Sequence, residues 1–167
     1  KEARIEAYSW GRQNWFEYLA EEHKACREDV ILMDLTSMSK IFVQGKDAEK
    51  VLNNICANDV SVPVGKVVYT QWLNERGGME ADLTVTRLAE DKYLIISAGD
   101  FYTHDMLWLK KYIPATSHAF VTDMTSAYTL LNIQGPKSRD LIQRLTTSDV
   151  SKDAFPYMTA KEIDLNY

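Results

Sequence analysis

The sequence predicts an α+β fold, in which a duplicated strand–helix–strand unit lies on antiparallel or mixed sheet. Three observations support this class. A turn with two adjacent glycines separates two strand-like runs near the middle of the chain. A strand, a glycine turn and a helix occur twice, with Gln134 following Gln44 at an offset of 90 residues. The chain has 167 residues, which is enough for one domain with a sizeable core.

A helix is expected near the start of the chain, over residues 10–28. Side chains suited to packing recur there at spacings of four, four and three residues, at Trp15, Leu19, His23 and Cys26. These spacings place them on one helical face. His23 and Cys26 are two candidate metal ligands, whereas a zinc site takes three or four. We therefore expect this pair to pack or to lie at the surface.

Apolar runs and period-two alternation predict the strands. They cover residues 30–35, 39–44, 67–73, 79–88, 92–97, 119–122 and 127–134. Helices are expected over residues 47–55, after the Gly45 turn, and over residues 100–112, where Asp100 is a suitable N-cap and Pro114 helps to end the helix. On the second of these helices, the side chains expected to be buried are Phe101, Leu107, Trp108 and Tyr112.

Residues 67–88 predict a β-hairpin around the turn at residues 74–78, because Gly77 and Gly78 can adopt the positive φ angles that tight turns need. Alternation after the turn predicts two faces. The core face takes Met79, Ala81, Leu83 and Val85, and the other face takes Glu80, Asp82, Thr84 and Thr86. Two interpretations fit this pattern: a half-solvated strand, or a carboxylate held on a rigid strand beside a polar ligand cavity. The pattern alone leaves both open.

The second copy of the repeat begins at Leu131, and its Pro136 suits the first turn of a helix. The same offset takes residues 59–61 (DVS) onto residues 149–151 (DVS). These matches predict a duplicated unit with a pseudo-twofold arrangement. By the same offset, the second hairpin turn would begin at the last residue of the chain. We therefore expect residues 1–167 to be the N-terminal part of one domain, cut before its end. Residues 158–166 are expected to form an open edge strand, through which chains could pair.

Composition and motifs argue against several classes of function. The net charge is −5 with both signs interspersed, so no basic stripe indicates nucleic acid, and the apolar runs are far shorter than a membrane span. The two cysteines predict reduced thiols in a reducing compartment, the cytoplasm or the mitochondrial matrix. The sequence contains no GxGxxG, Walker or GxSxG motif. The three histidines are scattered and predict no metal site, with His104 expected at the surface.

Several longer segments resemble one family. They are residues 22–27 (EHKACR), 33–40 (MDLTSMSK), 43–45 (VQG), 69–85 (YTQWLNERGGMEADLTV) and 133–136 (IQGP). They are similar to the motifs of the folate-binding aminomethyltransferase, or glycine cleavage T-protein, family. The resemblance extends over nearly the whole chain, and it implies the folate-binding-domain type of fold in an incomplete form.

Within that family, the segment Ala81-Asp82-Leu83 resembles the tetrahydrofolate domains that follow a flavin domain in sarcosine and dimethylglycine dehydrogenases. The resemblance implies capture of a one-carbon unit as 5,10-methylenetetrahydrofolate, with FAD only in a missing upstream domain. One alternative is a stand-alone glycine cleavage aminomethyltransferase, against which Ala81 argues because that branch usually has paired acids there. Another is a non-catalytic module of the pyruvate dehydrogenase phosphatase regulatory type.

The resemblance also implies roles for three residues. Asp82 is expected to be the catalytic carboxylate, because a carboxylate beside the folate can stabilise positive charge and help to remove a proton. Tyr69 is expected to line the folate site with its ring, and Thr84 to offer main-chain contacts to the pterin. The implied partners are folate and a methylated amine or its iminium, without nucleic acid or membrane. The parent protein is expected to be an enzyme, and the isolated chain to be inactive.

Overall fold

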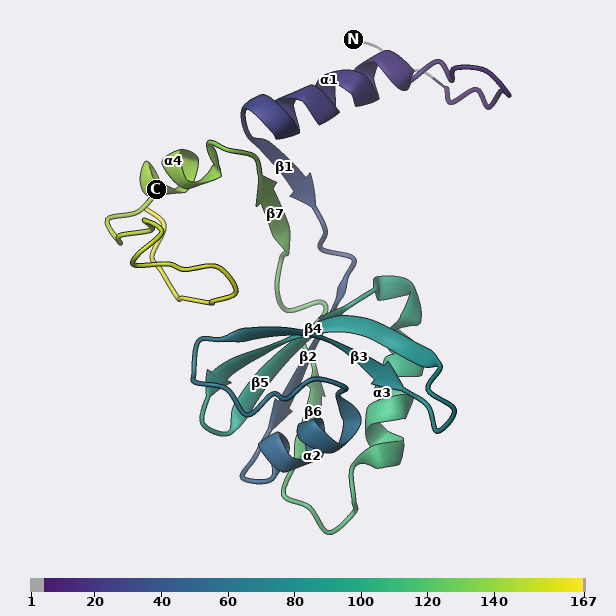
Figure 1. Ribbon diagram of the computed structural model, residues 1–167, viewed down its shortest axis with the longest axis vertical. Helices are drawn as coiled ribbons and strands as arrows, with labels where there is room; N and C mark the ends of the chain where they lie inside the picture. The colour runs from purple at the N-terminus through teal and green to yellow at the C-terminus, as the bar shows by residue number, and fades with distance from the viewer. Residues whose placement is uncertain (1–4, 167) are drawn as a thin grey trace. The chain divides into compact units, whose positions relative to one another are not determined.

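The computed structural model describes residues 5–166, which form two compact units (Figure 1). The larger one, here called the sheet unit, comprises Leu35–Leu130 and Ser151–Glu162. The small unit comprises the described residues up to Asp34, Leu131–Val150 and the described residues from Ile163 onward. All three predicted site residues therefore belong to the sheet unit.

The sheet unit is built on a five-stranded antiparallel sheet with the strand order β3-β4-β5-β2-β6. Its strands are β2 (Ser39–Gln44), β3 (Val67–Leu73), β4 (Met79–Ala89), β5 (Lys92–Ser97) and β6 (Phe120–Asp123). Its helices are α2 (Ala48–Ile55), the short 3-10 helix η1 (Gly99–Phe101) and α3 (Tyr102–Tyr112). Helices packed on an antiparallel sheet confirm the predicted α+β class.

The core of the sheet unit lies between α2, α3 and one face of the sheet. Its largest fully buried side chains are Trp72, Tyr93, Ile41, Leu52, Ile95 and Leu109. The burial predicted for the helix over residues 100–112 was partly wrong, because Phe101 in η1 and Leu107 in α3 are 58% and 61% exposed. The buried stripe of this helix instead runs through Asp105 and Leu109, which lie four residues apart and so share a face. The opposite side of the sheet, here called the open face, carries the alternate side chains of the strands.

The small unit pairs β1 (Ile31–Asp34) with β7 (Leu131–Gln134) in an antiparallel ladder. Helix α1 (Phe16–Glu28) precedes β1, and α4 (Ser138–Gln143) follows β7. Helix α1 starts later than predicted, because the Asn14 side chain bonds to the backbone of Ile5 and Ala7 and holds the preceding segment as a loop. His23 is exposed, and the Cys26 thiol donates to Gln134 Oε1 at 3.8 Å.

The backbone shows the duplication that the sequence predicts. Gly45 and Gly135 have matching φ angles of 122° and 123°. A Cβ atom at either position would collide with a backbone carbonyl oxygen, that of His118 or that of Asp29. The residue two positions after each glycine donates its amide to that same carbonyl, at 3.3 and 3.1 Å. Glycine is therefore required at both turns, and β2 meets β6 as β7 meets β1.

Residues 158–166 do not form the predicted edge strand. Within the described chain, this segment makes one isolated bridge, between Lys66 and Thr159, and a separate backbone bond from Asn166 to Leu145. A strand needs a continuous ladder of backbone hydrogen bonds to a neighbour. Scattered bonds leave this segment irregular, so the prediction was wrong.

We expect Leu109→Ala to lower the free energy of unfolding by about 2–5 kcal/mol, because it leaves a cavity in the core. Leu107→Ala is the matched control, since it makes the same change on the same helix at a side chain that is 61% exposed. It should change the free energy of unfolding by less than about 0.5 kcal/mol. Urea unfolding followed by circular dichroism measures both variants, and equal effects would contradict this assignment of the core.

Candidate functional site

The β3–β4 hairpin brings a tyrosine, a glutamine and an aspartate together on the open face of the sheet. In the ladder, Gln71 lies opposite Asp82 and Tyr69 lies opposite Thr84. The Tyr69 hydroxyl donates to Asp82 Oδ2 at 2.9 Å, and Gln71 Nε2 donates to Asp82 Oδ1 at 3.0 Å. Both carboxylate oxygens are therefore held by side chains from the neighbouring strand.

The turn that sets this register is organised by Asn74. Its backbone carbonyl accepts from the Gly77 amide, and its side-chain Oδ1 accepts from the amides of Arg76 and Gly78 at 3.0 and 2.9 Å. Gly77 has the expected positive φ, 78°. At Gly78 the need is for space, because a Cβ atom there would lie 2.8 Å from Asn74 Nδ2. These contacts fix which residues of β3 and β4 face one another.

A β-bulge interrupts the alternation predicted for β4, with Glu80 as the extra residue. The pairs on either side of it are Leu73 with Met79 and Trp72 with Ala81. The direction of the side chains changes at this point. Met79 is 64% exposed instead of lying in the core, and Glu80 contacts His104 on α3 instead of joining Asp82 on the open face. The predicted faces were therefore wrong for Met79 and Glu80.

A depression of about 290 Å³ lies beside Asp82. The pairing of β4 with β5 stops at Thr84 and Ile96, so residues 79–83 extend beyond the end of that ladder. The depression opens along this overhang. Its lining residues are Met79, Glu80, Ala81, Asp82, Ala98, Phe101 and Asp105.

The predicted site residues remain accessible from solvent. Asp82 is exposed, Tyr69 is 52% exposed, and Thr84 is half-buried. Thr84 follows Asp82 on the same face of β4, and Tyr69 lies across from it. Phe101, at 58% exposure, offers an apolar wall across the depression. The structure thus brings Tyr69, Asp82 and Thr84 together, with a carboxylate that is oriented by the protein and still open to a ligand.

The pKa of the Tyr69 phenol is shifted by the carboxylate that it contacts. Its hydrogen bond to Asp82 raises the pKa of Tyr69 above the ordinary value of 10.0, since loss of the proton would break this bond and place two negative charges together. Tyr69 therefore stays a hydrogen-bond donor at neutral pH. The tyrosine directs its proton toward Asp82 and keeps its ring available for packing.

Sequence reasoning missed a second set of polar residues beside the depression. His104 Nε2 lies 3.2 Å from Glu80 Oε2, and His104 Nδ1 lies 3.1 Å from Asp105 Oδ1. Asp105 is only 1% exposed, and its other oxygen accepts from the Ser97 hydroxyl at 2.7 Å. His104 does lie at the surface, with 39% of its side chain exposed, but no signal in the sequence indicates that both of its ring nitrogens contact acids. Alternation hides the contact, because only the bulge directs Glu80 toward α3.

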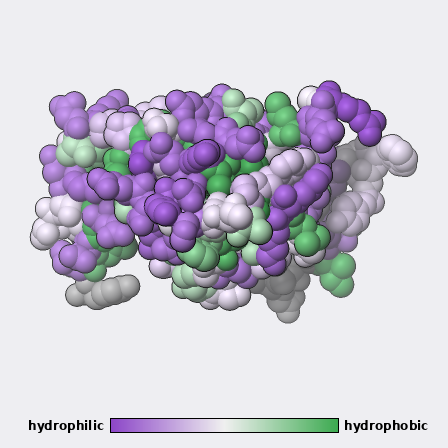
Figure 2. Space-filling model, turned by 90° about the horizontal axis from the view of Figure 1, so that it is seen from below, coloured by the Kyte–Doolittle hydropathy of each residue, from purple (hydrophilic) through white to green (hydrophobic). Residues whose placement is uncertain are grey.

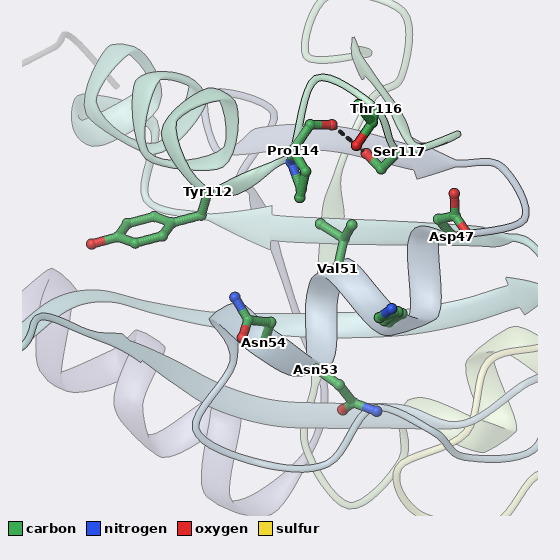
Figure 3. A pocket seen from close by; sticks show the side chains of 9 residues that line it. Asp47, Val51, Asn53, Asn54, Tyr112, Pro114, Thr116 and Ser117 are labelled. Atoms are coloured by element: carbon green, nitrogen blue, oxygen red, sulfur yellow. Dashed lines mark hydrogen bonds between the residues drawn. The ribbon is translucent and has the colours of Figure 1, made fainter.

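A larger depression, about 670 Å³, lies between α2 and the segment after α3 (Figure 3). Several of its polar side chains already serve the fold. Asp47 Oδ2 accepts from the His118 amide, Asn53 Oδ1 accepts from the Val60 amide, and the Ser117 hydroxyl donates to Pro114 O, each at 2.7 Å. The surface seen in Figure 2 mixes hydrophilic residues with smaller hydrophobic areas. Because several polar side chains of the larger depression already bond to the backbone, the hairpin remains the better candidate for a functional site.

Two further kinds of site were sought among residues 5–166. No helix in this part of the chain is both long and apolar enough to cross a membrane. In the same residues, no three side chains of histidine, cysteine, aspartate or glutamate come together as a group that could hold a metal ion.

The sequence matches the family described as the GCVT N-terminal domain over residues 3–167. It is 39% identical over 158 residues to 4-methylaminobutanoate oxidase (formaldehyde-forming) from Paenarthrobacter nicotinovorans, covering 95% of this chain and 19% of that protein. It is 35% identical over 158 residues to the mitochondrial pyruvate dehydrogenase phosphatase regulatory subunit of Mus musculus, covering 93% of this chain and 18% of that protein. The chain thus spans about a fifth of the length of these relatives.

Solved structures show the same fold. Glycine cleavage system aminomethyltransferase T from Bartonella henselae matches with a TM-score of 0.74 and 26% identity, covering 83% of this chain and 37% of that one. A chain of the heterotetrameric sarcosine oxidase from Corynebacterium sp. U-96 matches with a TM-score of 0.62 and 16% identity, covering 94% and 77%. This second likeness concerns the fold alone. Because the family match extends over nearly the whole sequence, the chain belongs to the GCVT N-terminal domain family of aminomethyltransferase-like proteins.

Proposed function

We propose that this domain binds tetrahydrofolate and captures a one-carbon unit from an oxidised methylated amine, yielding 5,10-methylenetetrahydrofolate. One observation carries the proposal. Asp82 is held by hydrogen bonds from Tyr69 and Gln71 on a paired strand, yet it remains exposed beside a depression. A carboxylate with this geometry suits a positively charged reaction partner.

The methylated amine is proposed from the relatives. The 39% identical protein is named as an oxidase of 4-methylaminobutanoate, an N-methyl amine. We propose that the parent of this chain likewise oxidises an N-methyl amine in a flavin domain, which gives a cationic iminium. The proposed balance is one iminium and one tetrahydrofolate consumed, with 5,10-methylenetetrahydrofolate, the demethylated amine and one proton formed. Tetrahydrofolate would supply the two nitrogens that take up the carbon.

The residues of the hairpin fit distinct tasks in this reaction. The Asp82 carboxylate would stabilise the positive charge of the iminium and accept the proton that is released. Tyr69 and Gln71 orient that carboxylate through their hydrogen bonds. The exposed Tyr69 ring offers a surface on which an aromatic part of the folate could pack. The proposed contact from Thr84 rests on its position two residues after Asp82 on the same face of β4.

A regulatory function is the second candidate, since a regulatory subunit of a phosphatase is 35% identical over this region. Such a module could retain the fold and Asp82 without catalysing transfer. A stand-alone glycine cleavage aminomethyltransferase is a third, supported by the fold of the Bartonella protein. The two candidates differ from the main proposal in whether amine oxidation and folate capture occur in one parent protein.

We expect Asp82→Asn in the full-length parent protein to reduce methylenetetrahydrofolate formed per amine oxidised by about 100-fold or more, the lower range of general acid–base contributions. The amide keeps the shape of the side chain but removes its charge. Amine oxidation, monitored through the reduction of the flavin, should be unchanged, because it would occur in the flavin domain. Product is measured by liquid chromatography against the amount of amine consumed.

The matched control is Asp91→Asn, the same change at an exposed acid in the turn between β4 and β5. It should leave the product ratio as in the unmodified protein. If Asp82→Asn also leaves the ratio unchanged, Asp82 has no part in the capture. A parent protein that oxidises no amine, with or without folate, would instead favour one of the two alternatives, the regulatory module or the stand-alone aminomethyltransferase.

A second prediction concerns the Tyr69 phenol. Asp82→Asn should lower the pKa of Tyr69 back toward 10.0, because the hydrogen bond to a charged acceptor is lost. Nuclear magnetic resonance of ring-labelled tyrosine measures this titration, with Tyr69→Phe to assign the signal. Asp91→Asn, which changes an exposed acid in the turn between β4 and β5, serves as the control. A pKa of Tyr69 that stays raised in Asp82→Asn would contradict the pairing.

A further inference from the structure

The bulge in β4 connects this strand to α3 through Glu80, in a contact that does not involve the residues of the open face. The extra residue, Glu80, sends its carboxylate toward α3, where Oε2 lies 3.2 Å from His104 Nε2. Its other oxygen accepts from Asn74 Nδ2 at 2.7 Å. Glu80 is thus held at once by the residue that organises the hairpin turn and by a helix that packs against the sheet.

His104 completes the connection to α3 and β5. Its second ring nitrogen lies 3.1 Å from Asp105 Oδ1, and Asp105 Oδ2 accepts from the Ser97 hydroxyl at the end of β5. Ionised carboxylates only accept hydrogen bonds, so both contacts are made fully when His104 carries a proton on each nitrogen. The ring also stacks on Trp108, with centroids 5.8 Å apart, which fixes its plane.

This connection holds the part of β4 that extends past its ladder with β5. Residues 79–83 lie beyond the last β4–β5 pair, and Asp82 is among them. On the β3 side the segment is paired, but the bulge interrupts that ladder between Met79 and Ala81. A bridge from Glu80 to α3 supplies a second point of attachment two residues from Asp82.

We propose that the Glu80–His104–Asp105 bridge is a positioning device that holds the overhang of β4, and with it Asp82, in the geometry for one-carbon capture. This inference rests on the proposed function. Glu80, His104 and Asp105 are positioning residues here, because they act through the backbone of β4 and not on the reacting atoms. The step they support is the transfer already balanced above.

The bridge gives the capture a pH dependence of defined sign. The hydrogen bond to Asp105 raises the pKa of His104 above 6.5. Burial opposes this shift, and the hydrogen bond to Glu80 and the charges of both acids add smaller upward shifts. The stabilisation that protonated His104 gives to the bridge is therefore complete below pH 6.5. It is lost as pH rises through the higher pKa that His104 has in the folded state. Lys111, farther along α3, adds positive charge near Glu80.

Glu80 sets the lower limit of this window. Its pKa is lowered below 4.5, first by the Asn74 hydrogen bond and then by His104, with burial opposing. The contribution of ionised Glu80 to the stability of the bridge is present above pH 4.5, and it disappears as pH falls through the lowered pKa of Glu80. The bridge is accordingly complete between pH 4.5 and pH 6.5, and it is lost as pH rises through the raised pKa of His104.

The test uses the full-length parent protein with tetrahydrofolate and its amine, from about pH 6 upward. The unmodified protein should lose methylenetetrahydrofolate formed per amine oxidised as pH rises through the His104 titration. Glu80→Gln and His104→Gln should each lower the ratio about tenfold at about pH 6, less than the ~100-fold that a misplacement of about 1 Å can cost, and should remove this pH step. His104→Arg should restore the ratio without the step, because a guanidinium can donate to both acids at every pH used.

Hydrogen exchange provides the readout that does not depend on turnover. The amides of residues 79–82 should exchange faster in Glu80→Gln and His104→Gln, while those of β2 keep their protection. His23→Gln, at an exposed histidine of the small unit, is the control and should change neither measurement. Circular dichroism confirms that each variant is folded before comparison, and a variant that does not fold is replaced by the other member of the pair.

The outcomes separate this inference from the function on which it rests. If the ratio depends on Asp82 but both bridge variants keep the normal ratio, pH step and exchange, the bridge has no positioning role. If both variants speed exchange but leave the ratio unchanged, the overhang is held without effect on capture, and the inference again fails. If the unmodified parent forms no methylenetetrahydrofolate, both the function and the inference are wrong.

Discussion

The structure of the site depends on the register between β3 and β4. That register places Gln71 opposite Asp82 and Tyr69 one pair further along, so that two donors reach the two oxygens of one carboxylate. A shift of one residue would turn Asp82 toward the core and its apolar neighbours toward solvent. Asn74 and the two glycines of the turn prevent such a shift by fixing how the chain reverses. The hairpin turn is thus part of the candidate functional site.

The bulge gives the same strand two different roles. At the bulge, Glu80 is directed toward α3, and beyond it Asp82 stands on the open face. An unbroken alternation would have placed both acids on one side, where two carboxylates would repel each other. The bulge separates them and gives each its own donors. Bulges are often found beside active sites, where they redirect a side chain, and this one does so for Glu80.

Much of the fold could be predicted from the sequence because the signals are local. The limits of β2 and β5 follow from period-two runs, and the repeat follows from matching turns at Gly45 and Gly135. The site residues came from resemblance to a family, since alternation alone left Asp82 as an ordinary strand acid. The Glu80–His104 contact could not be predicted, because it joins residues of separate elements through an irregularity that has no local signal.

A structure of the full-length parent protein with bound tetrahydrofolate would test the central claim most directly. The decisive quantity is the distance from the Asp82 carboxylate to the folate nitrogens that take up the carbon. We predict hydrogen-bond distance, about 3 Å, with the Tyr69 ring against the ligand and Tyr69 still bonded to Asp82. Folate bound away from the β3–β4 hairpin, with Asp82 facing only water, would contradict the claim.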